Sequence, residues 1–150
     1  MPKINRKAST ILSLGLTVLA MAIIVAAMFF IPQIVRWYNE LTGRPAADNP
    51  DAIIHLYIAF SVAFAAAVTL LLLLKNVIKE EMFTKSSVEY IRTISWLCFA
   101  EAVIFASLAR IYLPSLLVAF VLAFLGLILR VVKNVFEQAN AIKAENDFTV

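Results

Sequence analysis

The sequence is poor in the residues from which most catalytic and metal sites are built. Its 150 residues include one cysteine, one histidine and three glycines. A single cysteine, Cys98, excludes an intramolecular disulfide and a Cys-x-x-Cys redox pair. A single histidine, His55, cannot supply both axial ligands of a haem, and three scattered glycines do not make a phosphate-binding loop. The sequence therefore predicts no enzymatic activity and no bound cofactor or metal ion.

Charged residues are also scarce, and apolar residues are in excess. Charged residues make up 15% of the chain and hydrophobic residues 63%, against about 25% and about 45–50% in typical soluble domains. A soluble domain of this length cannot bury so much apolar surface, so the excess is expected to contact a lipid bilayer. In that setting the net charge of +3 bears on membrane orientation, and we expect no direct binding of nucleic acid.

Four segments are long and apolar enough to cross a bilayer core about 30 Å thick, which takes roughly 20 residues in a helix. They are residues 10–34, 52–74, 88–113 and 114–132, and a tail of residues 133–150 continues the fourth helix. The first apolar run is too long for the core of a signal peptide, so we expect a retained helix. The expected fold is a single all-α domain, residues 1–150, with four transmembrane helices.

Several residues in the connections predict where helices begin. Asn49 before Pro50 is typical of a capping residue followed by the first turn of a helix. Ser86 and Glu89 predict a capping box at the start of the third helix. Pro114 is expected to begin the fourth helix directly after the third, which makes these two helices a tight hairpin.

The distribution of Lys and Arg predicts how the chain is oriented in the membrane. Ten of the thirteen lie on one side of the four spans: Lys3, Arg6, Lys7, Lys75, Lys79, Lys85, Arg92, Arg130, Lys133 and Lys143. Arg36, Arg44 and Arg110 lie on the other side. Because Lys and Arg accumulate in cytoplasmic loops, both termini are expected in the cytoplasm.

One charged residue lies near the middle of a predicted span. Glu101 falls in the third apolar segment, where a carboxylate costs at least about 2.5–3.5 kcal/mol and usually faces other helices. Arg110 follows nine residues later, on the opposite face of the helix, and is expected to reach toward Asp48 or Asp51 near the surface. We therefore expect Glu101 to be neutral or bonded to a hydroxyl, as a contact between helices or between copies of the chain. The alternative is a residue that couples proton transport.

His55 and Cys98 are better explained as structural residues than as ligands or nucleophiles. His55 lies one turn into the second apolar segment and is expected to hydrogen bond locally, because a zinc ion needs several ligands. Cys98 lies one turn before Glu101 in apolar surroundings and is expected to behave as a small hydrophobic residue. Gly15 and Gly126 are expected to allow close approach of helices.

Two segments on the expected cytoplasmic side mix apolar and charged residues. The connection between the second and third helices carries Val77, Ile78, Met82 and Phe83 among its charges. After the fourth span, an apolar helix face is predicted, formed by Val131, Val135, Ala139 and Ile142. Either segment would pack on its own loop or the lipid surface, or form a docking surface for a soluble partner. The sequence leaves both interpretations open.

The same two segments carry short motifs. At the start of the third helix stand Phe83, Thr84, Val88, Ile91 and Arg92, and the chain ends in Glu145, Asn146, Asp147, Phe148, Thr149 and Val150. Together they resemble the YoaS-like family of bacterial four-helix membrane proteins of unknown function. That family shows Phe-Ser/Thr followed by Val-x-x-Leu/Ile-Arg-x-Ile, and a terminal Glu-Asn-Asp-Leu-Thr-Val, in which Phe148 here replaces leucine.

The resemblance implies a multi-pass protein of the bacterial inner membrane without an assigned enzymatic activity. Members of that family are commonly encoded beside a small helix-turn-helix regulator, which implies a membrane partner for that regulator. We therefore expect the two motifs to dock a cytoplasmic helix-turn-helix protein. The last three residues would add as a strand to a partner sheet, or Phe148 and Val150 would pack on the helices. The alternative function is a small proton-coupled transporter that uses Glu101. With either function, the chain could also form a homo-oligomer.

Overall fold

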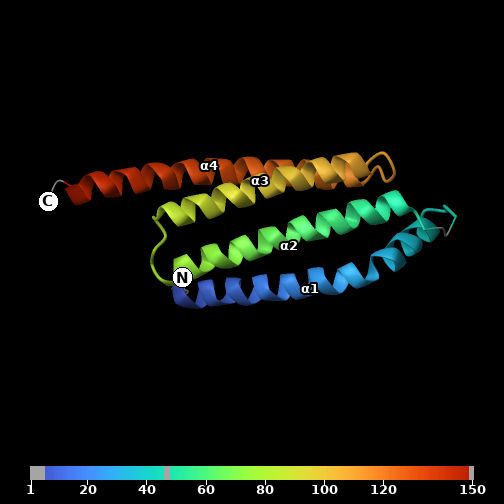
Figure 1. The fold of residues 1–150 in the computed structure, drawn as a ribbon, viewed down its shortest axis with the longest axis horizontal. Coiled ribbons are helices and arrows are strands. Elements are labelled where there is room, and N and C mark those ends of the chain that lie inside the picture. The colour runs from blue at the N-terminus through green and yellow to red at the C-terminus, as the bar shows by residue number, and fades with distance from the viewer. Residues whose placement is uncertain (1–5, 46–47, 149–150) are drawn as a thin grey trace, which may run out of the picture.

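The structure is a computed structural model that describes residues 6–45 and 48–148. It contains four helices: α1 (Arg6–Leu41), α2 (Pro50–Ile78), α3 (Lys85–Leu108) and α4 (Ser115–Phe148) (Figure 1). Each helix is long and apolar enough to cross a membrane. The prediction of an all-α protein with four membrane spans is therefore confirmed.

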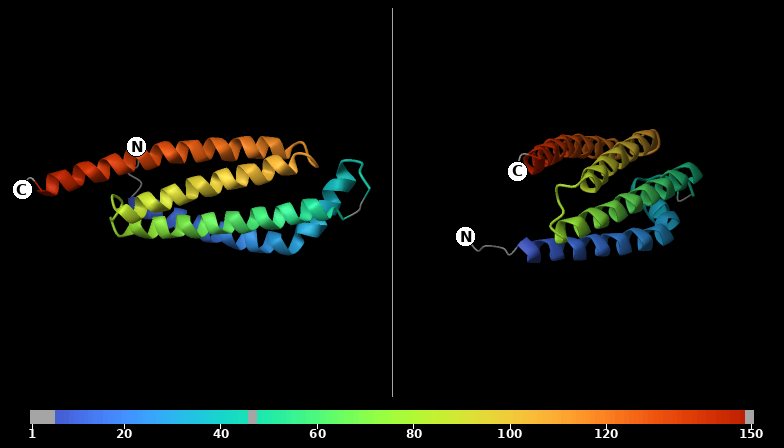
Figure 2. Two further views of the ribbon diagram at one scale, coloured as in Figure 1. Left: turned by 45° about the horizontal axis from the view of Figure 1, so that its top comes forward. Right: turned by 60° about the vertical axis from the view of Figure 1, so that its left-hand side comes forward.

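The helices are arranged as a row of antiparallel neighbours. α1 packs on α2, α2 on α3, and α3 on α4, and Figures 1 and 2 show them as successive layers. Over the residues that the structure describes, α4 makes no close backbone approach to α1 or α2. The row is therefore not closed into a ring by a contact between its first and last helices.

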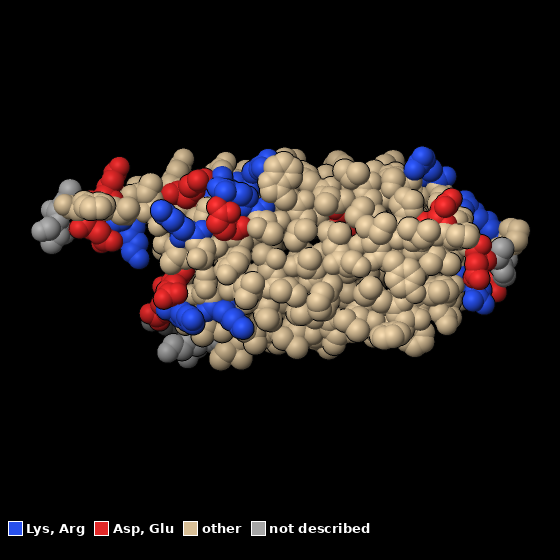
Figure 3. Space-filling view, in the orientation of Figure 1, with Lys and Arg blue, Asp and Glu red and all other residues tan. Residues whose placement is uncertain are grey.

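Charged side chains gather at the two ends of the row and leave an apolar band between them (Figure 3). We call the end that holds the start of α1, the α2–α3 connection and the last part of α4 the basic end. The other end, with the α1–α2 and α3–α4 connections, is the hairpin end. An apolar band of this kind is what a bilayer core requires.

The last turns of α1 lean toward the rest of the molecule at the hairpin end (Figures 1 and 2). Pro32 lies inside α1, and an interior proline removes a backbone hydrogen bond and bends a helix. The lean places Ile31 and Val35 in the main buried cluster, with Ala52, Leu108 and Tyr112. The hairpin end is thus where α1 meets the α3–α4 connection.

Polar contacts join the same parts of the hairpin end. The Tyr112 hydroxyl donates to Asn39 Oδ1 at 2.8 Å, and the Tyr112 ring stacks edge-on against Tyr38 with centroids 5.0 Å apart. Arg44 Nη1 donates to the carbonyl of Ile111 at 2.7 Å. These contacts tie the two connections of the hairpin end together.

The sequence-based spans locate all four helices but not their ends, since α1 and α2 extend beyond residues 10–34 and 52–74. Asn49 caps α2 as predicted, with its side chain accepting from the Ala52 N–H at 3.3 Å. The capping box at Ser86 is wrong, because Thr84 is the capping residue and α3 begins at Lys85. The third helix was predicted to reach residue 113 but ends at Leu108, and the fourth begins at Ser115 rather than Pro114.

A glycine allows α3 and α4 to pack closely. The Ser95 hydroxyl donates to the carbonyl of Gly126 at 2.8 Å across the two helices. A Cβ at Gly126 would lie 3.2 Å from the Phe99 ring and 3.3 Å from the Ser95 carbonyl. The prediction for Gly126 is therefore confirmed. The one for Gly15 is wrong, because a Cβ there would meet nothing within 4 Å.

Candidate functional site

The α2–α3 connection is folded around one buried hydroxyl group. Ser87 has an exposed fraction of 0%, and its Oγ donates to the Glu81 carbonyl at 3.1 Å and accepts from Asn76 Nδ2 at 3.2 Å. The Ser87 N–H donates to Thr84 Oγ1 at 3.3 Å. Glu80 adopts a positive φ of 61°. This hydrogen-bonded turn fixes the direction in which α3 leaves α2.

The apolar residues of the loop motif, which we define as residues 83–92, are buried to different extents. Val88 and Ile91 are buried, whereas Phe83 is 44% exposed. The Phe83 ring lies against the Phe136 ring of α4, with centroids 5.5 Å apart. Phe83 therefore joins the α2–α3 connection to α4.

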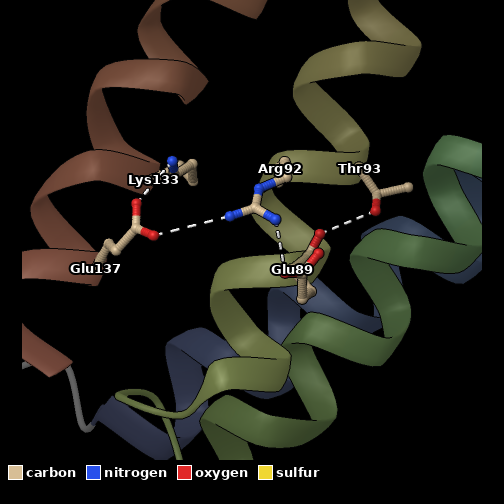
Figure 4. A network of polar contacts seen from close by, with 5 residues as sticks. All are labelled: Glu89, Arg92, Thr93, Lys133 and Glu137. Carbon is tan, nitrogen blue, oxygen red and sulfur yellow. Dashed lines mark hydrogen bonds and ion pairs between the residues drawn. The ribbon is translucent and has the colours of Figure 1, made fainter. Parts of the chain in front are cut away.

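The charged residue of the loop motif joins α3 to α4 through a chain of ion pairs (Figure 4). Arg92 Nη1 lies 2.7 Å from Glu89 Oε1, and Arg92 Nη2 lies 3.8 Å from Glu137 Oε1. Lys133 Nζ lies 2.7 Å from Glu137 Oε2. All four side chains contact solvent in part, and exposed ion pairs contribute little stability. The chain of ion pairs therefore links α3 to α4 but is expected to add little to the stability of their packing.

A groove of about 440 Å³ runs beside these ion pairs at the basic end. Its walls are residues 85–92 of α3 and residues 137–144 of α4. Lys85, Glu89 and Glu137 are exposed in it. The groove is therefore open, with charged side chains at its rim and Val88, Ala141 and Ala144 among its lining residues.

The last part of α4, residues 134–148, forms a helical segment that we call the α4 extension. It projects beyond the start of α3 (Figure 1). Its face toward α3 carries Glu137 and Asn140, whereas Val135 and Ile142 lie on the opposite face, 57% and 59% exposed. The α4 extension is thus an amphipathic helix whose outer apolar face is uncovered.

The terminal motif lies at the tip of the α4 extension. Glu145, Asn146 and Asp147 are exposed in the last turn of α4, and Phe148 is 91% exposed. The alternative in which Phe148 packs on the helices is therefore wrong. Thr149 and Val150 lie outside the described residues, so the predicted strand addition stays a prediction.

Glu101 lies in a second groove, of about 320 Å³, between α2, α3 and α4. Its exposed fraction is 6%, and neither carboxyl oxygen has a hydrogen-bond partner among the residues that the structure describes. The hydroxyls of Thr17 on α1 and Ser61 on α2 bond to carbonyls of their own helices. Of the two expectations for Glu101, the hydroxyl partner is therefore wrong and the neutral carboxyl group stays a prediction.

The sequence pattern of one protein family, described as a protein of unknown function (DUF2975), matches residues 33–150. The chain belongs to the DUF2975 family. Neither the curated proteins nor the solved structures contain a match.

The DUF2975 match begins one residue after Pro32, at the lean of α1. It includes the buried cluster of the hairpin end, the loop motif, the Glu101 groove and the α4 extension. The earlier part of α1, which packs on α2, lies outside it. Both candidate sites therefore fall within the part of the chain that the DUF2975 family shares.

The remaining polar residues that the sequence singled out are far from either groove. Arg110 lies in the α3–α4 connection and its Nε donates to the Ser107 carbonyl at 3.3 Å. The expected reach toward Asp48 or Asp51 is wrong: among the described residues Arg110 forms no ion pair with either, and Asp48 pairs with Arg36 at 2.8 Å. His55 Nδ1 lies 2.6 Å from the Asp51 carbonyl, which confirms a local hydrogen bond.

Sequence analysis did not identify the residues of the buried turn or the α4 residues that face α3. Ser87 and Asn76 form the buried turn, but a serine beside Ser86 carries no signal of which of the two is buried. Phe136 and Glu137 face α3, and only the relative rotation of α3 and α4 shows this. Among the described residues, no group of three or more His, Cys, Asp or Glu could hold a metal ion.

Proposed function

We propose that this DUF2975 chain is a non-enzymatic membrane anchor that binds a cytoplasmic protein through the α4 extension. The observation that carries the proposal is the uncovered apolar face of a helix that continues past the membrane span. Trp96 and Arg130, whose guanidinium carbon lies 4.6 Å from the ring centroid, have the character of an interfacial pair. Residues 134–148 lie beyond them, and at 1.5 Å per residue they extend about 22 Å.

The apolar face of the α4 extension has the form of a helix that docks into a groove of another protein. Val135 and Ile142 are seven residues apart and so lie on one face, with Ala139 between them. Gln138 and Asn146 are also on that side, so no charge interrupts the apolar residues. Apolar side chains that stay in water are unfavourable, and contact with a partner would remove them from it.

The location and the identity of the partner rest on the sequence. The excess of Lys and Arg places the basic end in the cytoplasm, and the resemblance to YoaS-like proteins points to the bacterial inner membrane and a small helix-turn-helix regulator. In this proposal Val88 and Ile91 of the loop motif do not contact the partner, because they are buried. The exposed residues Lys85 and Glu89 then contribute to the rim of the site.

The proposal is tested by co-purification from mild detergent, with mass spectrometry of the eluate to detect a small helix-turn-helix protein. A double variant, Val135→Ser with Ile142→Ser, is expected to lose the partner while it stays in the membrane at the normal level. The matched control is Ala141→Ser, which changes an exposed residue on the α3 side of the same helix. Retention of the partner by the double variant would contradict docking at this face.

Proton-coupled transport by Glu101 is the second candidate function. The buried and unpartnered carboxyl group favours it, because such groups inside membranes commonly lie on ion pathways. Transport also needs a water path, and both carboxyl oxygens are shielded from solvent in this structure. Glu101→Gln in proteoliposomes is expected to abolish substrate-dependent proton flux if this function holds, and unchanged flux would exclude it.

A further inference from the structure

The groove around Glu101 has a row of alanines along one of its walls. On α2, Ala59, Ala63 and Ala66 recur at a spacing that places them on one helix face. The rest of the lining consists of Phe60 of α2, Leu97, Cys98 and Phe105 of α3, and Val118 and Leu122 of α4. The alanines leave space beside the carboxyl group that larger side chains would fill.

The groove is open to the lipid rather than sealed by helix packing. α2 and α4 both line it, yet these two helices make no close backbone contact over the described residues. Their separation leaves α3, which carries Glu101, between them. A molecule dissolved in the bilayer would enter sideways, between α2 and α4. The side chains over the Glu101 carboxyl group, whose oxygens are shielded in this structure, would have to move aside for it.

The chemistry of the groove is an acid in apolar surroundings without a counterion. Apart from Glu101, Cys98 is the only lining residue whose side chain is not a hydrocarbon. The arginines that follow in the sequence have other partners. Arg110, in the α3–α4 connection, bonds to the Ser107 carbonyl, and Arg130 of α4 lies over the Trp96 ring. A buried carboxyl group without a partner is costly, and a donor with positive charge would offset that cost.

We propose that the Glu101 groove binds a lipophilic amine that enters from the bilayer. Its ammonium group pairs with the carboxylate of Glu101, and its apolar part lies along the alanine face of α2. The volume of about 320 Å³ is near the lower limit of small-molecule sites, which favours a small amine over a bulky one. This binding does not depend on the docking of a protein at the α4 extension.

The experiment uses the full chain in nanodiscs of phosphatidylcholine, whose headgroups carry no net charge. Two probes are compared: an alkyl amine with a diazirine in its chain, and the same molecule with a hydroxyl in place of the amine. After photolysis, mass spectrometry of the peptides locates and quantifies the label. We expect the amine to label the groove residues of α2 and α3 saturably, and excess decylamine to compete. We expect about tenfold less labelling with the alcohol, because it cannot form an ion pair.

Three variants separate binding from folding. Glu101→Gln removes the charge at nearly constant shape and is expected to lower amine labelling about tenfold without changing labelling by the alcohol. Ala63→Leu fills the groove but keeps Glu101, and is expected to lose the label. Ala65→Leu makes the same change on the exposed side of α2 and is expected to leave amine labelling unchanged.

Equal labelling by amine and alcohol, unaffected by Glu101→Gln, would overturn the proposal and assign the groove to lipid chains. Saturable labelling confined to other helices would overturn it as well. Photolabelling measures binding at the Glu101 groove, and co-purification measures docking at the α4 extension. Failure of one proposal can therefore be distinguished from failure of the other.

Discussion

The loop motif and the α4 extension are neighbours at the basic end, yet they bury their side chains to opposite extents. In the loop motif, Ser87, Val88 and Ile91 are buried and their contacts lie within the chain. In the α4 extension, Ile142 and Phe148 are exposed at 59% and 91%. The first region is therefore part of how the helices are held, and the second is surface that the chain itself does not use.

This difference shows that a recognisable motif and a docking surface need not coincide. Thr84 ends the α2–α3 turn and caps α3, and Arg92 bridges to α4 through Glu137. Each of these roles constrains residue type without any partner. Substitutions in the loop motif should therefore change stability, and substitutions on the outer face of the α4 extension should change binding alone.

The largest difference between the two regions is expected from truncation of an isoleucine in each. Ile91→Ala should leave a cavity between packed helices and lower the free energy of unfolding by about 2–4 kcal/mol. Ile142→Ala removes an exposed side chain and should change it by less than about 0.5 kcal/mol. Denaturation of the purified variants in one detergent measures both. Equal losses would contradict the comparison.

A somewhat smaller effect is expected from the buried hydroxyl of the α2–α3 turn. Ser87→Ala leaves Asn76 Nδ2 without its acceptor, which should lower the free energy of unfolding by about 1–3 kcal/mol. The adjacent Ser86 is exposed, so Ser86→Ala should shift it by less than about 0.5 kcal/mol. Thermal melts of the two variants side by side make the measurement. A larger loss of unfolding free energy for Ser86→Ala than for Ser87→Ala would contradict this structure of the turn and favour Ser86 as the capping residue.

Loss of the α3 cap should have an effect of about 1 kcal/mol. Thr84→Ala removes the oxygen that accepts from the Ser87 N–H, and loss of a capping side chain costs about 0.5–2 kcal/mol. Thr84→Ser keeps the oxygen and should be close to the natural protein. Amide exchange at the first turn of α3 is the most local measurement. Exchange that is equally slow in all three proteins would show that the cap is not needed.

The smallest effect is expected from the ion pairs between α3 and α4. Arg92→Gln breaks the pairs with Glu89 and Glu137, which are partly exposed, so the free energy of unfolding should fall by less than about 1 kcal/mol. The difference between the two proteins should shrink further as salt is added. A loss above about 2 kcal/mol that salt does not reduce would contradict this assignment of Arg92, because exposed pairs do not reach it.

The sequence predicts the fold because membrane spans depend mostly on composition. Runs of apolar residues about 20 long can do little else than cross a bilayer, so the four helices follow from the sequence. The cap at Asn49 and the close approach at Gly126 also follow, because each depends on a single residue type. The cap at Thr84 does not, since three hydroxyl residues stand within four positions and only the folded turn selects among them.

The surroundings of Glu101 were less accessible to sequence analysis, because they depend on how three helices are rotated against one another. A polar residue in a membrane span indicates that its side chain contacts other helices, but the sequence does not show which residues it contacts. The end of α3 at Leu108 is a similar case. The Ser115 hydroxyl donates to the Phe105 carbonyl at 3.1 Å, so a side chain from the start of α4 helps to close the turn at the end of α3. No periodicity of apolar residues carries that information.

The most direct test of docking at the α4 extension is photo-crosslinking in living cells. A photoreactive amino acid is placed at position 142, on the outer face, or at position 140, on the face toward α3. We predict a crosslink from position 142 to a small cytoplasmic helix-turn-helix protein, and a crosslink within the chain, to α3, from position 140. Crosslinks from position 142 to lipid alone, or to the same partner from both positions, would contradict the account.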